Sequence, residues 1–329
     1  MSTTVSTAKQ IGAVLVIVVS FFVPEVVIEF TPWRADAALI IAGMLPALIG
    51  WTYAPRYALA SIPVSAVLNA LAMVVFGHPI ITTLLMVLIA VMVGISALRS
   101  LHAVATFAAI QPAIAAISGP PTVSFSGTTP GLAGQALVGA GVVVIGGLWA
   151  VLIGAMLLRN RSSGAPAPVP APIVASYTGT LVLLLGAAAF VASTWFSGTT
   201  AGWVLLTILL VARPTYAESR FMIAERTVGT IVGAALAAVL AMIVSNRAMV
   251  VLMGTVAMVV AAVLHLQHAR YGYFTVFVTA AVVLLNASGG NVFTLGLQRV
   301  LYTMVGVGLV AVVVAVSETV LGRSTTASV

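Results

Sequence analysis

The sequence contains no cysteine and very few charged residues. With no cysteine among 329 residues, disulfides, thiolate metal sites and cysteine nucleophiles are excluded. Hydrophobic residues make up 62% of the chain and charged residues only 6%, against roughly 45–50% and about 25% in soluble domains. No soluble core needs this much apolar surface. We therefore expect an all-α polytopic membrane protein, with the lipid bilayer as its first partner.

The net charge of +7 does not indicate a nucleic-acid partner. The basic residues are scattered at the ends of apolar segments, as membrane topology requires, and form no basic patch. No phosphate-binding glycine loop, nucleophile elbow or metalloprotease motif is present. We therefore expect no enzyme activity, no catalytic residues, no cofactor and no metal site.

Twelve apolar segments are candidate membrane crossings, since about 20 helical residues span ~30 Å of hydrocarbon. They are residues 9–28, 35–53, 57–76, 80–98, 101–118, 131–158, 174–195, 199–213, 226–245, 248–266, 272–288 and 298–320. The first segment is interrupted by Pro24-Glu25 and the eighth is short, so ten or eleven crossings remain alternatives.

Basic residues divide unequally between the two sides of the membrane if all twelve segments cross. Ten of the thirteen lie on one side, namely Lys9, Arg56, Arg99, Arg159, Arg161, Arg213, Arg220, Arg226, Arg270 and Arg323. The other side receives Arg34, Arg247 and Arg299. Because lysine and arginine concentrate in cytoplasmic loops, we expect a multi-pass protein of the cytoplasmic (inner) membrane with both termini in the cytoplasm.

A proline- and alanine-rich linker at residues 159–173 separates two halves, residues 1–158 and 174–329, with six predicted helices each. The turn Gly77-His78 matches Ser245-Asn246, and the stretch from His102 matches the one from Tyr271. An even number of crossings gives both halves the same orientation, so we expect two parallel six-helix repeats. The alternative is that any two apolar blocks align this well.

Polar residues within the predicted helices have two interpretations. Gln111-Pro112 places an amide beside a helix break near the middle of its segment, and Asn69 also lies within its helix. Broken helices with polar groups form the binding sites of many transporters, but such amides also bond neighbouring helices. Glu25 and Glu29 are four residues apart, so each raises the other's proton affinity if they are helical. They are candidates for proton coupling, or a solvated helix end paired with Arg34.

The stretch from Arg213 to Gly233 combines five charges with two glycines. Arg213-Pro214 ends the eighth segment, and Tyr216 to Glu225 are interpreted as a short interfacial connection. Glu225-Arg226 then begins the ninth helix. Gly229 and Gly233, spaced Gly-x-x-x-Gly, are expected to let another helix approach closely. Gln298-Arg299 stands in the twelfth segment, followed by Gly306 and Gly308.

These motifs resemble the signature of the fusaric-acid-resistance (FUSC) family, which includes the aromatic acid exporters. The resemblance covers the second half; in the first half, Tyr57 to Ser61 lack the Glu-Arg-x-x-Gly-Thr element, and no cytoplasmic domain separates the halves. It implies export of small, often aromatic, carboxylic acids or related toxic compounds, driven by the proton gradient or the membrane potential. Anion paths use amides, hydroxyls and an occasional arginine. The candidates are Asn69, Gln111, Arg226, Gln298 and Arg299.

The competing hypothesis is a non-transporting membrane scaffold that binds another protein through glycine-rich helix faces. For an exporter, the expected partners are a small organic anion and either a further copy of the chain or a periplasmic adaptor. The prolines within predicted helices and the two-block repeat favour the transporter.

The topology can be tested with single cysteines at Ser163 and Ser126, because the natural chain has none. We expect an impermeant thiol reagent to label position 163 from the cytoplasmic side and position 126 from the opposite side. Labelling of both from one side would contradict the twelve-crossing topology.

Overall fold

The structure, a computed structural model, describes residues 37–119, 131–157, 168–244, 246–266, 269–286 and 292–326, with a few positions between 16 and 28. All regular secondary structure in these ranges is helical. The chain divides into two compact units, one of residues 21–215 and one of residues 216–329 with residues 1–20.

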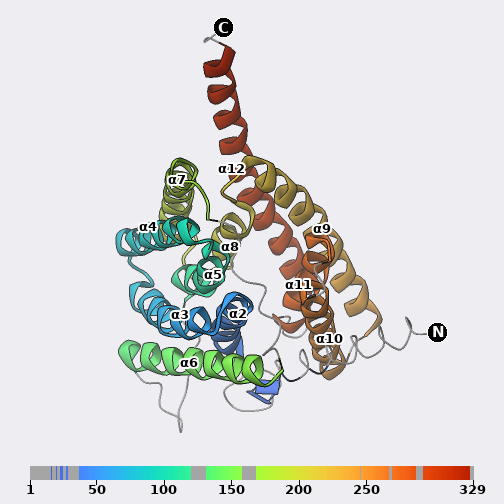
Figure 1. The fold of residues 1–329 in the computed structure, drawn as a ribbon. Coiled ribbons are helices and arrows are strands. Elements are labelled where there is room, and N and C mark those ends of the chain that lie inside the picture. Colours follow the sequence, from blue (N-terminus) through green and yellow to red (C-terminus); the bar gives the residue numbers. More distant parts are fainter. Residues whose placement is uncertain are drawn as a thin grey trace, which may run out of the picture. The chain divides into compact units, whose positions relative to one another are not determined.

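The first unit is built around α5 (Figure 1). Its described helices are α2 (Ala37–Tyr53), α3 (Pro55–Val75), α4 (Pro79–Ser96), α5 (His102–Ser118), α6 (Leu132–Leu157), α7 (Ala171–Trp195) and α8 (Gly202–Val211), with the short 3-10 helix η2 (Ala97–Arg99). Helix α5 contacts α2, α3, α4, α7 and α8. Its buried side chains are mainly alanines, such as Ala108, Ala109 and Ala113, which let many helices approach one axis.

Prolines set both the starts and the interiors of these helices. Pro55 and Pro79 stand in the first turns of α3 and α4, where a missing N–H removes no helical hydrogen bond. Pro46, Pro63 and Pro112 lie inside α2, α3 and α5, as predicted. Each removes one backbone hydrogen bond and so weakens its helix locally.

The second unit contains α9 (Tyr216–Ile243), α10 (Arg247–Leu266), α11 (Tyr271–Asn286) and α12 (Val292–Thr326). Helix α9 contacts both α11 and α12, α11 also contacts α12, and α10 packs against α11. Gly229 and Gly233 lie in the contact between α9 and α11. A Cβ at Gly229 would be 2.7 Å from the Thr275 Cβ, and one at Gly233 would be 2.3 Å from the Val276 carbonyl oxygen.

Eleven predicted segments correspond to α2–α12, whereas most of residues 9–28 lie outside the described residues. Within the described ranges, α3, α4 with η2, α6, α7, α9 and α12 are long and apolar enough to cross a membrane. The chain is therefore a multi-pass membrane protein. The interpretation of Tyr216 to Glu225 as a connection was wrong, because these residues form the first turns of α9. These residues carry charged side chains, but their backbone is helical.

The compact units do not divide the chain at the proline-rich linker. Helix α7 packs against α4 and α8 packs against α5, so both belong with the first unit. Helix α7 also begins at Ala171, inside the predicted linker. The division into halves 1–158 and 174–329 stays a prediction from sequence repetition.

Substitution of Gly233 by alanine tests the close contact of α9 with α11. The added methyl would meet the Val276 carbonyl at 2.3 Å, so we expect destabilisation of roughly 1–3 kcal/mol from overpacking. Gly308→Ala in α12 is the control, since a Cβ there meets nothing within 4 Å. Thermal unfolding in detergent should show a lower melting temperature for Gly233→Ala alone. Equal melting temperatures would contradict the packing.

Candidate functional site

Two arginines lie buried in the second unit, on helices that pack together. Arg226 on α9 and Arg299 on α12 are each only 1% exposed, and they are close enough to interact electrostatically. Arg226 is the eleventh residue of α9, about 15 Å along the helix axis from Tyr216. Arg226 therefore lies well inside its helix. The sequence had instead indicated a position at the start of the helix.

Residues with hydroxyl groups recur on α9, α11 and α12, four positions from an arginine or from another hydroxyl residue. On each helix, this spacing places them on one face. We call these residues together with the two arginines the arginine cluster: Arg226 and Thr230 on α9, Tyr271, Thr275 and Thr279 on α11, and Arg299 and Thr303 on α12. The four threonines have no exposed surface. Tyr271 interacts electrostatically with Arg299. The cluster thus consists of buried polar side chains on three helices that pack together.

Most donors of the arginine cluster have no hydrogen-bond partner among the described residues. The Thr275 hydroxyl donates to the Tyr271 carbonyl at 3.0 Å. By contrast, Nε, Nη1 and Nη2 of Arg226 are buried without a partner in that part of the chain, as are the hydroxyls of Thr230, Tyr271, Thr279 and Thr303. An arginine at the centre of a membrane helix costs about 2.5–3.5 kcal/mol on insertion scales. Because burying Arg226 has this free-energy cost, we expect the residue to serve a function.

The two guanidinium groups also destabilise each other. Like unit charges repel by about 4 kcal/mol at 4 Å for an effective dielectric constant of 20, and by half as much at twice the distance. A bound anion would reverse the sign of this interaction and accept hydrogen bonds from the free donors. The arrangement is therefore suited chemically to binding an anion.

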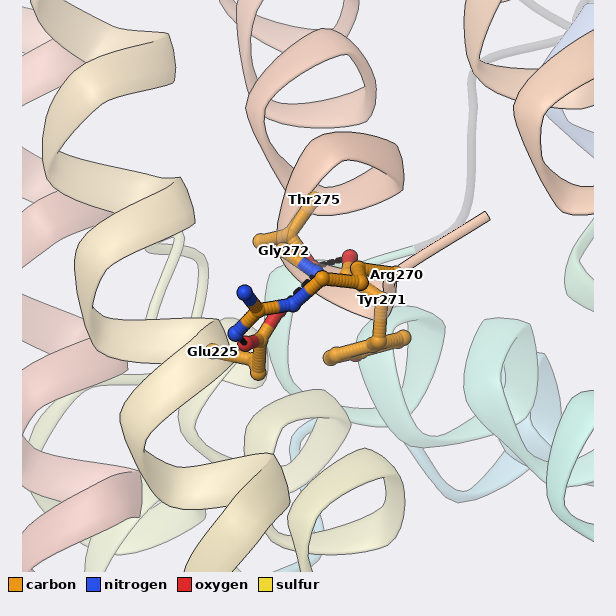
Figure 2. Close-up of polar contacts among 5 residues, drawn as sticks. All are labelled: Glu225, Arg270, Tyr271, Gly272 and Thr275. Carbon is orange, nitrogen blue, oxygen red and sulfur yellow. Dashed lines mark hydrogen bonds and ion pairs between the residues drawn. The ribbon is translucent and has the colours of Figure 1, made fainter. Parts of the chain in front are cut away.

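An ion pair fixes α9 against the start of α11 next to the cluster (Figure 2). The Glu225 carboxylate accepts hydrogen bonds from Arg270 Nη2 and from the Gly272 backbone N–H, both at 2.5 Å. It thereby caps the N-terminus of α11, where the helix dipole favours a negative charge. Because Glu225 precedes Arg226 and Arg270 precedes Tyr271, this contact sets the positions of both cluster residues.

A second ion pair, Arg220 with Glu318, joins α9 to α12. Both side chains are partly exposed, so the pair contributes little stability. All three helices of the arginine cluster are therefore connected by ion pairs outside the cluster itself.

The remaining predicted site residues are distributed over both units. Gln298 is half-buried beside Arg299 on α12. Asn69 is fully buried in α3, where its amide donates to the Ser65 carbonyl at 2.8 Å and its Oδ1 has no described partner. Gln111 is half-buried in α5. Glu25 and Glu29 lie outside the described residues, so their proton-coupling role stays a prediction.

The hydroxyl residues of the arginine cluster and the Glu225–Arg270 pair were not predicted from the sequence. The fourfold spacing of Arg226 with Thr230, and of Arg299 with Thr303, was the signal that could have found the hydroxyls. No sequence signal indicates that Glu225 bonds to Arg270, because the two lie on different elements.

The arginine cluster lies within the part of the chain that matches a known family. Residues 187–313 match the fusaric acid resistance protein-like family. This confirms the resemblance for that segment, from the second part of α7 to most of α12. No curated protein and no solved structure matches the chain. The match covers less than half of the chain and includes all of α8, α9, α10 and α11.

Removal of the Glu225 carboxylate tests its role in joining α9 to α11. The Glu225 side chain is 11% exposed and its loss leaves the Gly272 N–H without an acceptor, so Glu225→Ala should cost about 1–3 kcal/mol. Glu318→Ala is the matched control, because its exposed pair should contribute less than about 1 kcal/mol. Thermal unfolding of both variants measures the difference. A larger effect of Glu318→Ala would contradict this assignment.

Proposed function

We propose that this protein exports small carboxylate anions across the cytoplasmic membrane and binds them at the arginine cluster. The observation that carries this proposal is the buried guanidinium of Arg226, without a described partner and beside Arg299. It lies in the fusaric acid resistance protein-like segment, and fusaric acid is itself an aromatic carboxylic acid. A planar guanidinium can hold a carboxylate with two parallel hydrogen bonds.

The membrane potential supplies a driving force for such a transporter. An interior-negative potential favours the exit of an anion by about 2.3 kcal/mol per charge for each 100 mV. The site then needs to lower the barrier to the anion, and it needs no acidic relay. The arginine cluster is suited to lowering this barrier, since it contains positively charged groups and hydroxyls.

We also propose that the chain is built from two related halves and that the anion site lies within the second. Helix pairs recur in support of it: α3 packs on α5 and α6 as α9 packs on α11 and α12, and α4 packs on α5 as α10 packs on α11. The buried Ser61 and Ser65 of α3 stand where α9 has Gly229 and Gly233. Twelve crossings, parallel six-helix repeats and cytoplasmic termini form one consistent proposal with these pairings.

The arginine cluster favours transport over a scaffold function. A scaffold needs small residues and apolar faces, which α9 supplies with its glycines. It has no need of two buried guanidinium groups that repel each other. Burial of charge carries a desolvation cost, and these two like charges do not compensate for each other, so a purely structural role is a poor reason to keep both.

Neutralising each cluster arginine tests the function. We expect Arg226→Gln and Arg299→Gln to reduce efflux of weak acids from cells at least tenfold, about the effect of 1.4 kcal/mol of lost binding. Lysine at either position should restore efflux only partly, because it keeps the charge but loses the planar fork. Efflux is measured for a panel of aromatic and aliphatic acids at equal protein abundance in the membrane.

Arg220→Gln serves as the control, since Arg220 is exposed and lies outside the cluster. It should export as the natural protein does. Normal efflux from the Arg226→Gln and Arg299→Gln variants would overturn the cluster as the binding site. Asn69 and Gln111 would then be the candidates to test.

A further inference from the structure

The first unit carries an unbalanced positive charge. Residues 37–215 contain five arginines and no aspartate or glutamate. Among the described residues, Arg56 is the second residue of α3, Arg99 ends η2 and Arg213 follows α8. The predicted topology places all three on the cytoplasmic side, where the membrane surface contains anionic phospholipids. Lipid head groups are therefore suitable counter-charges for this side of the first unit.

Helix α3 combines one of these arginines with an exposed apolar face. Pro63, Val67 and Val74 follow Arg56 by seven, eleven and eighteen residues. These spacings correspond to about two, three and five helical turns, so all four residues lie on one face of the helix. All four are exposed, Val67 by 56% and Val74 by 45%. A basic end thus leads directly into an apolar face that is accessible from the membrane.

This face of α3 is hollowed at its helix-interior proline. An open cavity of about 310 Å³ is lined by Pro63, Val64, Val67 and Leu68. The four lining side chains are apolar and offer no hydrogen bond to water or to a polar ligand. A hydrocarbon chain, by contrast, gains dispersion contacts in such a cavity. The lining therefore favours an acyl chain as the occupant.

The distance from Arg56 to the cavity matches the depth of one membrane leaflet. Pro63 lies about 10 Å further along the helix axis than Arg56, and Val67 about 16 Å further. Half of the hydrocarbon core is about 15 Å thick. A phospholipid whose phosphate lies at Arg56 could therefore place an acyl chain in the cavity without leaving its leaflet.

The Arg56 side chain is oriented by its neighbour. Its Nη2 donates to the Tyr57 hydroxyl at 3.0 Å, and its guanidinium carbon lies 4.8 Å from the centre of the Tyr57 ring. This hydrogen bond uses one of the five N–H donors of a guanidinium. Because the side chain is exposed, other donors can reach a phosphate, which guanidinium groups bind through charge-assisted hydrogen bonds.

We propose that Arg56 and the cavity at Pro63 form a binding site for one anionic phospholipid, with the phosphate at the guanidinium and an acyl chain in the cavity. A second copy of the chain fits this face less well. A two-fold contact about an axis along the membrane normal would bring two copies of Arg56 to the same membrane surface, where they repel each other. An anionic lipid instead supplies the opposite charge.

The charge requirement is tested with purified full-length protein in a non-ionic detergent. Phosphatidylglycerol and phosphatidylcholine with identical acyl chains are titrated, and the first bound lipid is quantified by native mass spectrometry. We expect Arg56→Gln to bind phosphatidylglycerol roughly fivefold more weakly, which corresponds to about 1 kcal/mol for one basic residue near an anionic surface. Phosphatidylcholine binding should be unchanged. Arg99→Gln is the matched control, because Arg99 is also exposed on the same predicted side, and it should bind both lipids as the natural protein does.

The cavity is tested by filling it. Val67→Trp should weaken binding of both lipids and reduce the rise in melting temperature that each produces. Val74→Trp is the control, since Val74 lies on the same face about 27 Å from Arg56 and does not line the cavity. It should retain lipid binding.

Four results would overturn the lipid site. Equal losses in Arg56→Gln and Arg99→Gln would show attraction by general surface charge, and unchanged binding to Val67→Trp would exclude the cavity. Glycerol 3-phosphate, which has no acyl chain, would indicate a free phosphate site if it raised the melting temperature as much as phosphatidylglycerol. Dissociation of a dimer by Val67→Trp would make this face a contact between copies. None of these measurements involves efflux, so the proposed function is tested separately.

Discussion

Burial of positive charge in an apolar helix bundle is the constraint on which the functional part of this protein depends. Arg226 and Arg299 are 1% exposed in a chain with only 6% charged residues. Apolar side chains dominate the rest of the bundle, where packing alone is sufficient. At the arginine cluster, packing does not compensate for the desolvation of charge, so polar or charged groups must do so. The threonine hydroxyls on the same helix faces supply further donors.

The cluster owes its position to contacts that are themselves not part of it. Gly229 and Gly233 bring α9 against α11 so closely that a Cβ at either position would overlap its neighbour. The Glu225 carboxylate then fixes the start of α11 by accepting from Arg270 and Gly272. The glycines allow α9 and α11 to approach closely, and the ion pair fixes their position along each other. Together they fix α9 against α11, and α12 packs against both of these helices.

The two units differ in the chemistry of their buried polar side chains. In the second unit, α9 and α11 carry arginine and threonines, whereas α3 and α5 of the first unit carry the buried Ser65, Asn69 and Thr106. The first unit also contains the helix-interior prolines of α2, α3 and α5. The second unit thus buries charged side chains, whereas the buried polar side chains named in the first unit are neutral and its helices contain prolines. A transporter built from such halves would bind its anion mainly in the second.

The sequence by itself determined the class of protein and the positions of its helices, because apolar length and proline placement act locally along the chain. It missed the first turns of α9, where Glu218 and Arg220 continue the helix beyond its apolar part. It also selected Arg226 and Arg299 without indicating that they are neighbours. Only the tertiary structure decided that, because the proximity of residues on α9 and α12 depends on how two helices far apart in sequence pack together.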